Sequence, residues 1–301
     1  MADVTHTDLI AQMNEPDRRR LLERSNRAGL LHLLGHSAAL VLTGTWIMTG
    51  AAGWPFALVV HGFLLIFLFS PLHETIHETA FASRRINRAV AVVCGFFLIL
   101  PPRWFRAFHF AHHRHTNDPE RDPELATQPP ATWPEYLWRL TGLPVWREHI
   151  AGLVRIAAGT RQDRFVSANA RGKIVREARW FLAGYGCLIA VSIFSDSLVL
   201  VWLWVLPALL GQPFLRAYLM AEHTLCPHVG NMLENSRTTF TARLMRFIAW
   251  NMPYHAEHHS YPSVPFHKLP EFHAMIRSHL GTTSDGYSAF HREMLGVLRG
   301  R

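Results

Sequence analysis

The chain has 301 residues, of which 49% are hydrophobic and only 17% are charged, and it contains ten tryptophans. So low a charge content is typical of a membrane protein rather than a soluble enzyme. The net charge of +8 comes mostly from arginines that lie between the apolar stretches, a distribution that favours contact with anionic lipid and excludes a nucleic-acid binder.

The first part of the chain predicts a polar N-terminal segment followed by a membrane hairpin. Residues 1–27 are polar, contain no apolar run typical of a cleavable signal peptide and favour a short amphipathic helix at the membrane surface. Residues 28–50 and 56–72 are apolar stretches, each long enough to cross a hydrocarbon layer of about 30 Å. An uncharged turn at residues 51–55 separates them, so we expect the first hairpin within residues 28–82.

Residues 83–179 are expected to form part of a cytoplasmic cap. The basic run at residues 83–88 places this side of the membrane in the cytoplasm. Residues 89–100 are apolar but too few to span a bilayer, so we expect an interfacial or re-entrant segment. Beyond them, three tryptophans indicate amphipathic helices that lie on the membrane surface: Trp133, Trp138 and Trp146.

Residues 180–215 predict a second hairpin, with apolar stretches at residues 180–194 and 198–210. The turn Ser195-Asp196-Ser197 carries no lysine or arginine, as expected for the outer face. Residues 216–301 complete the cap. The sequence therefore predicts a single all-α integral membrane domain with four transmembrane helices in two hairpins, a cytoplasmic helical cap and both termini in the cytoplasm.

Three clusters among the 20 histidines have helical spacing, and each lies beside an apolar segment. They are the pair His73 and His77, the triplet His109, His112 and His113, and the triplet His255, His258 and His259. A spacing of i, i+3 and i+4 places imidazoles on one side of a helix, and the two hairpins bring all three clusters to the same membrane face. Neutral imidazole is a common ligand of iron, zinc and copper. Eight imidazoles exceed the needs of one ion, and two ions of five or six coordination would use eight or nine, with His223 as the ninth candidate ligand.

Six acidic side chains near these histidines are candidates to orient the imidazoles through the second ring nitrogen. They are Glu74, Glu78, Asp118, Asp122, Glu222 and Glu257. The alternative for each is exposure to water or an ion pair with a neighbouring arginine. His115 lies next to the first triplet but off its face, and we expect it to be structural.

The histidine pattern resembles that of the membrane-bound fatty acid desaturase and hydroxylase superfamily, whose signature is HxxxH, HxxHH and a second HxxHH. These motifs stand here at residues 73–77, 109–113 and 255–259. The stretch from Asn251 to Pro265 is similar to a bacterial branch that contains fatty-acid, carotenoid and small-metabolite desaturases and hydroxylases. The resemblance covers roughly residues 28–280.

The resemblance implies an oxidoreductase with a non-haem centre of two iron ions. Such a centre uses O₂ as co-substrate and two electrons to abstract hydrogen from an unactivated C–H bond of a lipid-like or amphipathic substrate. We expect a desaturase, with a hydroxylase or monooxygenase of the same superfamily as the alternative, and no catalytic residue beyond the metal centre. The expected location is a bacterial-type inner membrane.

Electrons are expected from a separate ferredoxin-like donor and its reductase, because the chain shows no ferredoxin cysteine pattern and no cytochrome-like segment. Its three cysteines are widely spaced and form no disulfide framework. The arginine-rich cytoplasmic face would attract an acidic donor.

Three other functions would use part of the histidine pattern. Residues 73–77 match the HExxH motif of zinc metalloproteases, but that interpretation leaves the six histidines of the triplets without a role. A haem protein could use histidines within the spans, although hydrogen bonds across the bundle are the favoured interpretation of His32, His36 and His61. A metal transporter would place acids and histidines deep within several spans, whereas the clusters here lie at the ends of the apolar segments.

Overall fold

The computed structural model describes residues 4–300, and the chain is helical over 71% of its length with almost no strand. The predicted all-α class is therefore confirmed. Two short helices, α1 (His6–Gln12) and α2 (Glu15–Leu21), precede the first long helix, α3 (Asn26–Thr49). Side chains of Thr5, Asn14 and Ser25 cap the three helices, which explains why each helix begins where it does.

The first hairpin is formed by α3 and α4 (Trp54–Ile66), which pack together along the chain. Gly50 and Gly53 in the turn have φ angles of 62° and 81°, a left-handed conformation that favours glycine. The short helix α5 (Phe69–Ile76) follows α4 closely and carries His73 into the protein interior.

Three helical stretches are long and apolar enough to cross a membrane: Glu15–Thr49, Trp54–Ile76 and Ala168–Phe194. The number rises to four if α6 (Arg84–Phe97) and α7 (Pro102–His115), which bend by 98° at the break between them, are counted as one span. The break coincides with Pro101-Pro102, and the bend accords with the expected interfacial or re-entrant segment at residues 89–100.

The second predicted hairpin has a less regular form. Helix α10 (Ala168–Phe194) ends at the expected turn, but the return segment begins with a π-helical turn, η2 (Val201–Val205), and continues as α11 (Leu206–His223). Residues 198–210 are not among the stretches that satisfy the length and apolarity of a span. The count of four spans in two hairpins, and the segment boundaries at residues 27, 82, 179 and 215, stay predictions.

Helices α4 and α11 form the closest helix crossing of the bundle. Gly62 and Gly211 face each other there, and a Cβ atom on either residue would meet the backbone of the opposite helix. Beside this crossing, His61 Nε2 lies 3.1 Å from the carbonyl oxygen of Leu203 in the π-helical turn, and on α3 His36 Nε2 lies 2.7 Å from the carbonyl oxygen of Leu64. Hydrogen bonds across the bundle, as expected for these histidines, leave neither one positioned as a haem ligand.

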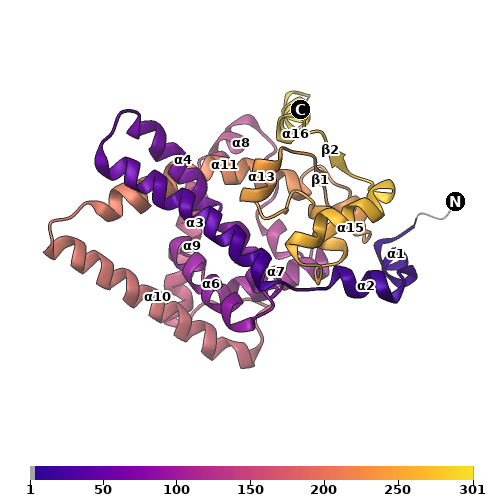
Figure 1. Cartoon of the computed structure of the whole chain (residues 1–301), viewed down its shortest axis with the longest axis horizontal. Coiled ribbons are helices and arrows are strands. Elements are labelled where there is room, and N and C mark those ends of the chain that lie inside the picture. Colours follow the sequence, from indigo (N-terminus) through magenta and orange to yellow (C-terminus); the bar gives the residue numbers. More distant parts are fainter. Residues whose placement is uncertain (1–3, 301) are drawn as a thin grey trace.

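The remaining elements pack around these helices. Figure 1 shows α10 along one edge, the α3–α4 turn toward one end, and α1, α2 and α15 toward the other, with α13 near the middle and α16 at the top. The strands β1 and β2 are parallel, with Thr238 opposite Thr283. The bounds are η1 (Pro123–Ala126), α8 (Trp133–Leu140), α9 (Leu143–Ala158), α12 (Met232–Asn235), β1 (Thr238–Thr239), α13 (Arg243–Ile248), α14 (His255–Ser260), η3 (Phe266–Lys268), α15 (Leu269–Ile276), η4 (Arg277–His279), β2 (Thr283–Ser284) and α16 (Tyr287–Arg299).

Candidate metal centre

Four helices bring histidines to one place between the bundle and the cap. Helix α5 supplies His73, and His77 follows directly as its C-cap residue. Helix α7 supplies the first triplet and the six-residue helix α14 the second, while His223 is the last residue of α11. The end of α11 is held by Arg237, whose Nη1 donates to the carbonyl oxygens of Ala221 at 2.6 Å and Thr224 at 2.8 Å. This contact explains why α11 stops with His223 facing the other histidines.

The structure brings all nine predicted histidines together in two groups. Site A consists of His73, His77, His109, His113 and His258, and site B consists of His112, His223, His255 and His259. In each group, one ring nitrogen from every residue lies within 4.8 Å of the others. Because metal–imidazole bonds are about 2 Å long, ligands on opposite sides of one ion lie about 4 Å apart. Both groups have the dimensions of a metal site.

The ring nitrogens face one another in a way that hydrogen bonds alone do not satisfy. In site B, His223 Nε2 lies 3.2 Å from His112 Nε2 and 3.0 Å from His255 Nε2. A neutral imidazole carries one N–H, so three such atoms turned toward each other cannot all be paired. In both sites further Nε2 atoms are buried without a partner in the described part of the chain, those of His77, His258 and His259. A cation shared by each group would satisfy these nitrogens, so the donor set fits bound metal.

The two sites adjoin each other. The rings of His113 in site A and His259 in site B are stacked, with centroids 4.1 Å apart. Helices α7 and α14 each contribute to both sites, because neighbouring residues in each HisHis pair point in different directions around the helix. Two ions held here would be neighbours within one centre.

A single family model matches the segment of the chain that carries this centre. The family model described as fatty acid desaturase matches residues 49–291, which include all nine histidines. The chain belongs to the fatty acid desaturase family. The match confirms the resemblance identified in the sequence, and it identifies the protein as a member of an oxidoreductase family. A comparison with curated proteins gave no significant match.

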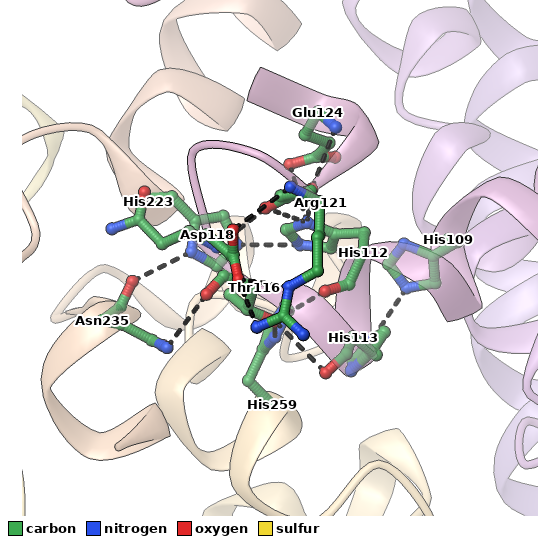
Figure 2. Close-up of polar contacts among 12 residues, drawn as sticks. His109, His112, His113, Thr116, Asp118, Arg121, Glu124, His223, Asn235 and His259 are labelled. Atoms are coloured by element: carbon green, nitrogen blue, oxygen red, sulfur yellow. Dashed lines mark hydrogen bonds and ion pairs between the residues drawn. The ribbon is translucent and has the colours of Figure 1, made fainter. Parts of the chain in front are cut away.

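In this family member, three of the four imidazoles of site B have a hydrogen-bond partner for the second ring nitrogen. Nδ1 of His112 lies 2.9 and 3.0 Å from the two carboxylate oxygens of Asp122. The other two contacts are those of His259 with Thr116 Oγ1 at 3.1 Å and of His223 with the carbonyl oxygen of Asn235 at 3.2 Å. Nδ1 of the fourth, His255, lies 3.4 Å from Glu222 Oε1 without a hydrogen bond. Figure 2 shows how His112, His223 and His259 converge from different elements within this network. Such contacts fix the ring orientation and direct Nε2 into the site.

The imidazoles of site A have fewer hydrogen-bond partners for their second ring nitrogens than those of site B. The Nδ1 atoms of His73, His113 and His258 are buried without a hydrogen-bond partner among the described residues. Glu74 Oε1 lies 3.8 Å from Nδ1 of His258, too far for a hydrogen bond, with both side chains fully buried. The two sites therefore differ in how firmly the protein holds their imidazoles.

The six predicted acids divide evenly. Asp122 makes a hydrogen bond with a ligand-type histidine, as an orienting group would, while Glu222 and Glu74 lie beside such histidines without one. The other three are engaged elsewhere: the alternative interpretation, an ion pair with an arginine, holds for two of them, whereas Glu257 is fully buried and pairs with no arginine among the described residues. Glu78 pairs with Arg84 and Arg88, Asp118 pairs with Arg121, and Glu257 accepts from Thr238 Oγ1 and contacts His273.

Three orienting contacts were not foreseen. Thr116 and Glu124 follow the first triplet closely in sequence, and Glu124 Oε2 lies 3.5 Å from Nδ1 of His112, so proximity to the triplet was an available signal. Asn235 acts on His223 through its backbone carbonyl, for which a sequence contains no signal. His115 belongs to neither group, as expected.

Burial keeps the histidines that lie outside the spans in the form that binds metal. It lowers the pKa of His223 to about 3 and the pKa values of His255, His258 and His259 well below the usual value. Burial also opposes ionisation of Asp122, but the hydrogen bond and charge of His112 outweigh it and lower the pKa of this carboxyl group. Neutral imidazole is the form that binds metal, and His112 is the exception here: burial opposes its protonation, but Glu124 and Asp122 outweigh burial and raise its pKa.

The arrangement of His73, His77 and Glu74 argues against the zinc-protease interpretation of residues 73–77. His73 and His77 do not form a separate site but share site A with three histidines from α7 and α14. The carboxylate of Glu74 accepts hydrogen bonds from Thr79 Oγ1 at 3.1 Å and from the N–H of Phe266 at 3.3 Å, so it is turned into the protein. These contacts, together with the family match, favour one two-site centre over an isolated HExxH site.

Proposed function

We propose that the protein is an O₂-dependent, non-haem di-iron oxidoreductase that desaturates a lipid-like or amphipathic substrate within the membrane. The observation that carries this proposal is the pair of adjoining all-imidazole sites inside the segment that matches the family. Imidazole ligation without thiolate favours iron that activates dioxygen over the thiolate-bound sites of structural zinc.

The residues of site A would hold one ion and those of site B the other. Bound iron would supply the oxidising power that removes hydrogen from an unactivated C–H bond. The contribution of the protein is to hold and enclose the centre. Six of the nine imidazoles, those of His73, His109, His112, His255, His258 and His259, are at most 3% exposed, which excludes bulk water from the ring nitrogens.

Desaturation is proposed over hydroxylation because the matching family is described by that activity. The two reactions differ in whether a second hydrogen lies within reach after the first is removed. Apolar side chains among the helices would orient the substrate. Analysis of the product by mass spectrometry, as a new double bond or an added oxygen, distinguishes the two.

The proposed partners follow from the electrons that the metal centre needs and from the net charge of the chain. The reaction needs two electrons, and we propose a separate ferredoxin-like donor and its reductase. The net charge of +8 supports an acidic donor. We further propose a bacterial-type inner membrane with the metal centre and both termini on the cytoplasmic side, supported by the basic residues at the ends of the apolar stretches.

Metal analysis of the purified, detergent-solubilised protein tests the proposal, with His258→Ala as the variant and His115→Ala as the matched control. We expect about two iron ions per chain in the wild type and in the control, and a clear loss in His258→Ala. One zinc ion per chain that is kept in His258→Ala but lost in His73→Ala would contradict the proposal and restore the protease interpretation.

A further inference from the structure

A basic cleft lies between α7 and the beginning of α10, outside the metal centre. It has a volume of about 300 Å³. Its lining contains four cationic side chains and no acid, with aromatic and aliphatic residues between them: Arg103, Arg106, Ala107, Phe110, Arg114, Phe165, Ala170, Lys173 and Ile174. A hollow of this size is suited to a small group rather than to the flat surface of a protein.

Three of the four cations have no anionic partner. Arg103 pairs with Glu177, whose Oε1 lies 3.4 Å from its Nε. The nearby Glu78 is occupied by Arg84 and Arg88. Within residues 4–300, no ion pair involves Arg106, Arg114 or Lys173. The cleft therefore keeps a local excess of positive charge.

Arg106 is the most constrained of these cations. Its guanidinium group lies 4.2 Å from the centre of the Phe110 ring, and its Nη1 is buried without a hydrogen-bond partner. A buried unpaired guanidinium nitrogen is costly, and the planar guanidinium group matches the oxygens of a phosphate. An anion in the cleft would supply the missing partner.

The position of the cleft indicates where the anion comes from. Lys173 lies near the start of α10, a candidate membrane span whose first turns also carry Arg171, Arg176 and Arg179. The apolar part of the same helix follows directly. The cleft therefore lies where the span leaves the apolar layer, which is the level of the lipid headgroups. Figure 1 shows α10 at the edge of the molecule, where lipid has access.

We propose that this cleft binds the phosphate headgroup of an anionic membrane lipid, with Arg106 and Arg114 as the principal ligands and Lys173 at the rim. The aromatic and aliphatic lining accommodates the start of the acyl chains. Phe110 separates the cleft from site A, with its ring centroid 5.2 Å from that of His77. The proposal rests on neither the metal nor the reaction.

The test measures lipid binding to the full-length protein in detergent micelles, by native mass spectrometry with phosphatidylglycerol and phosphatidylcholine. The variant is Arg106→Gln/Arg114→Gln, and the matched control is Arg171→Gln/Arg176→Gln, which removes the same charge from exposed positions outside the cleft. We expect the wild type and the control to retain phosphatidylglycerol in preference to phosphatidylcholine. The cleft variant should lose at least about tenfold in affinity for phosphatidylglycerol, since two charged hydrogen-bonding groups are removed.

Equal losses in the variant and the control, or no preference for phosphatidylglycerol in the wild type, would overturn the proposal. Glycerol 3-phosphate serves as a soluble competitor. If it displaces the lipid at equal concentration, the site takes a soluble phosphate ester and the membrane source is wrong. Lys173→Gln provides a second variant at an exposed position, so the test does not depend on the folding of the Arg106 variant. It should also weaken retention, and unchanged retention would remove Lys173 from the site.

Discussion

Nδ1 of His112 lies 2.9 Å from one carboxylate oxygen of Asp122 and 3.0 Å from the other, and both side chains are almost fully buried. The same carboxylate accepts the N–H of Asn117 at 2.7 Å. The loop after α7 is therefore tied to an imidazole of site B. Asp122 orients this imidazole without itself facing the position of the ion.

Changing Asp122 to Asn should weaken metal binding at site B while leaving the protein folded. The loss of the charged acceptor should lower metal affinity about 10–100-fold, as for other groups that orient metal-bound histidines. Titration of iron into metal-free protein measures the effect. Asp118→Asn is the control, because Asp118 pairs with Arg121 away from the ligands, and an equal loss there would contradict the assigned role.

Changing His223 to Ala should remove bound metal from site B, because two other imidazoles of the site point at its Nε2. We expect iron content to fall by about half or more and turnover to be lost. The measurement is iron per chain and product formation in the same preparation. The control is His228→Ala, an exposed histidine five residues later that belongs to neither group, and it should keep its full iron content.

Changing Gly62 or Gly211 to Ala should destabilise the bundle. Either new methyl group would meet the backbone of the opposite helix, and such overpacking costs about 1–3 kcal/mol. Thermal unfolding in detergent, followed by tryptophan fluorescence, measures the change. Gly186→Ala is the control, because a Cβ atom there has no neighbour within 4 Å, and its melting temperature should be unchanged or higher.

The stability of the metal-free protein should fall as the pH is lowered below 6.5. Burial lowers the pKa of His223 from 6.5 to about 3, so the unfolded chain takes up a proton that the folded chain does not. Between these two values each such group costs about 1.4 kcal/mol for every unit of pH. Melting temperatures measured with a chelator present at pH 7.5 and pH 5.5 test this. A melting temperature that rises toward acid pH would contradict the neutral state of the buried imidazoles.

Local patterns in the sequence were sufficient to find the ligand-type histidines and most of the apolar stretches. The spacing of His255, His258 and His259 is a property of one helical turn, and the length of an apolar run is read directly from the chain. Both depend on residues close in sequence, so no knowledge of the fold was needed. The same holds for the break at Pro101-Pro102, which separates α6 from α7.

Only the tertiary structure decided how these residues are shared between two sites. His112 and His113 are adjacent in sequence but belong to different groups, because the division depends on how α5, α7, α11 and α14 meet. The same packing selected Asp122 over Asp118 as the orienting acid and brought Gly62 against Gly211. Contacts of this kind join residues far apart in the chain, and their geometry arises only when the helices pack.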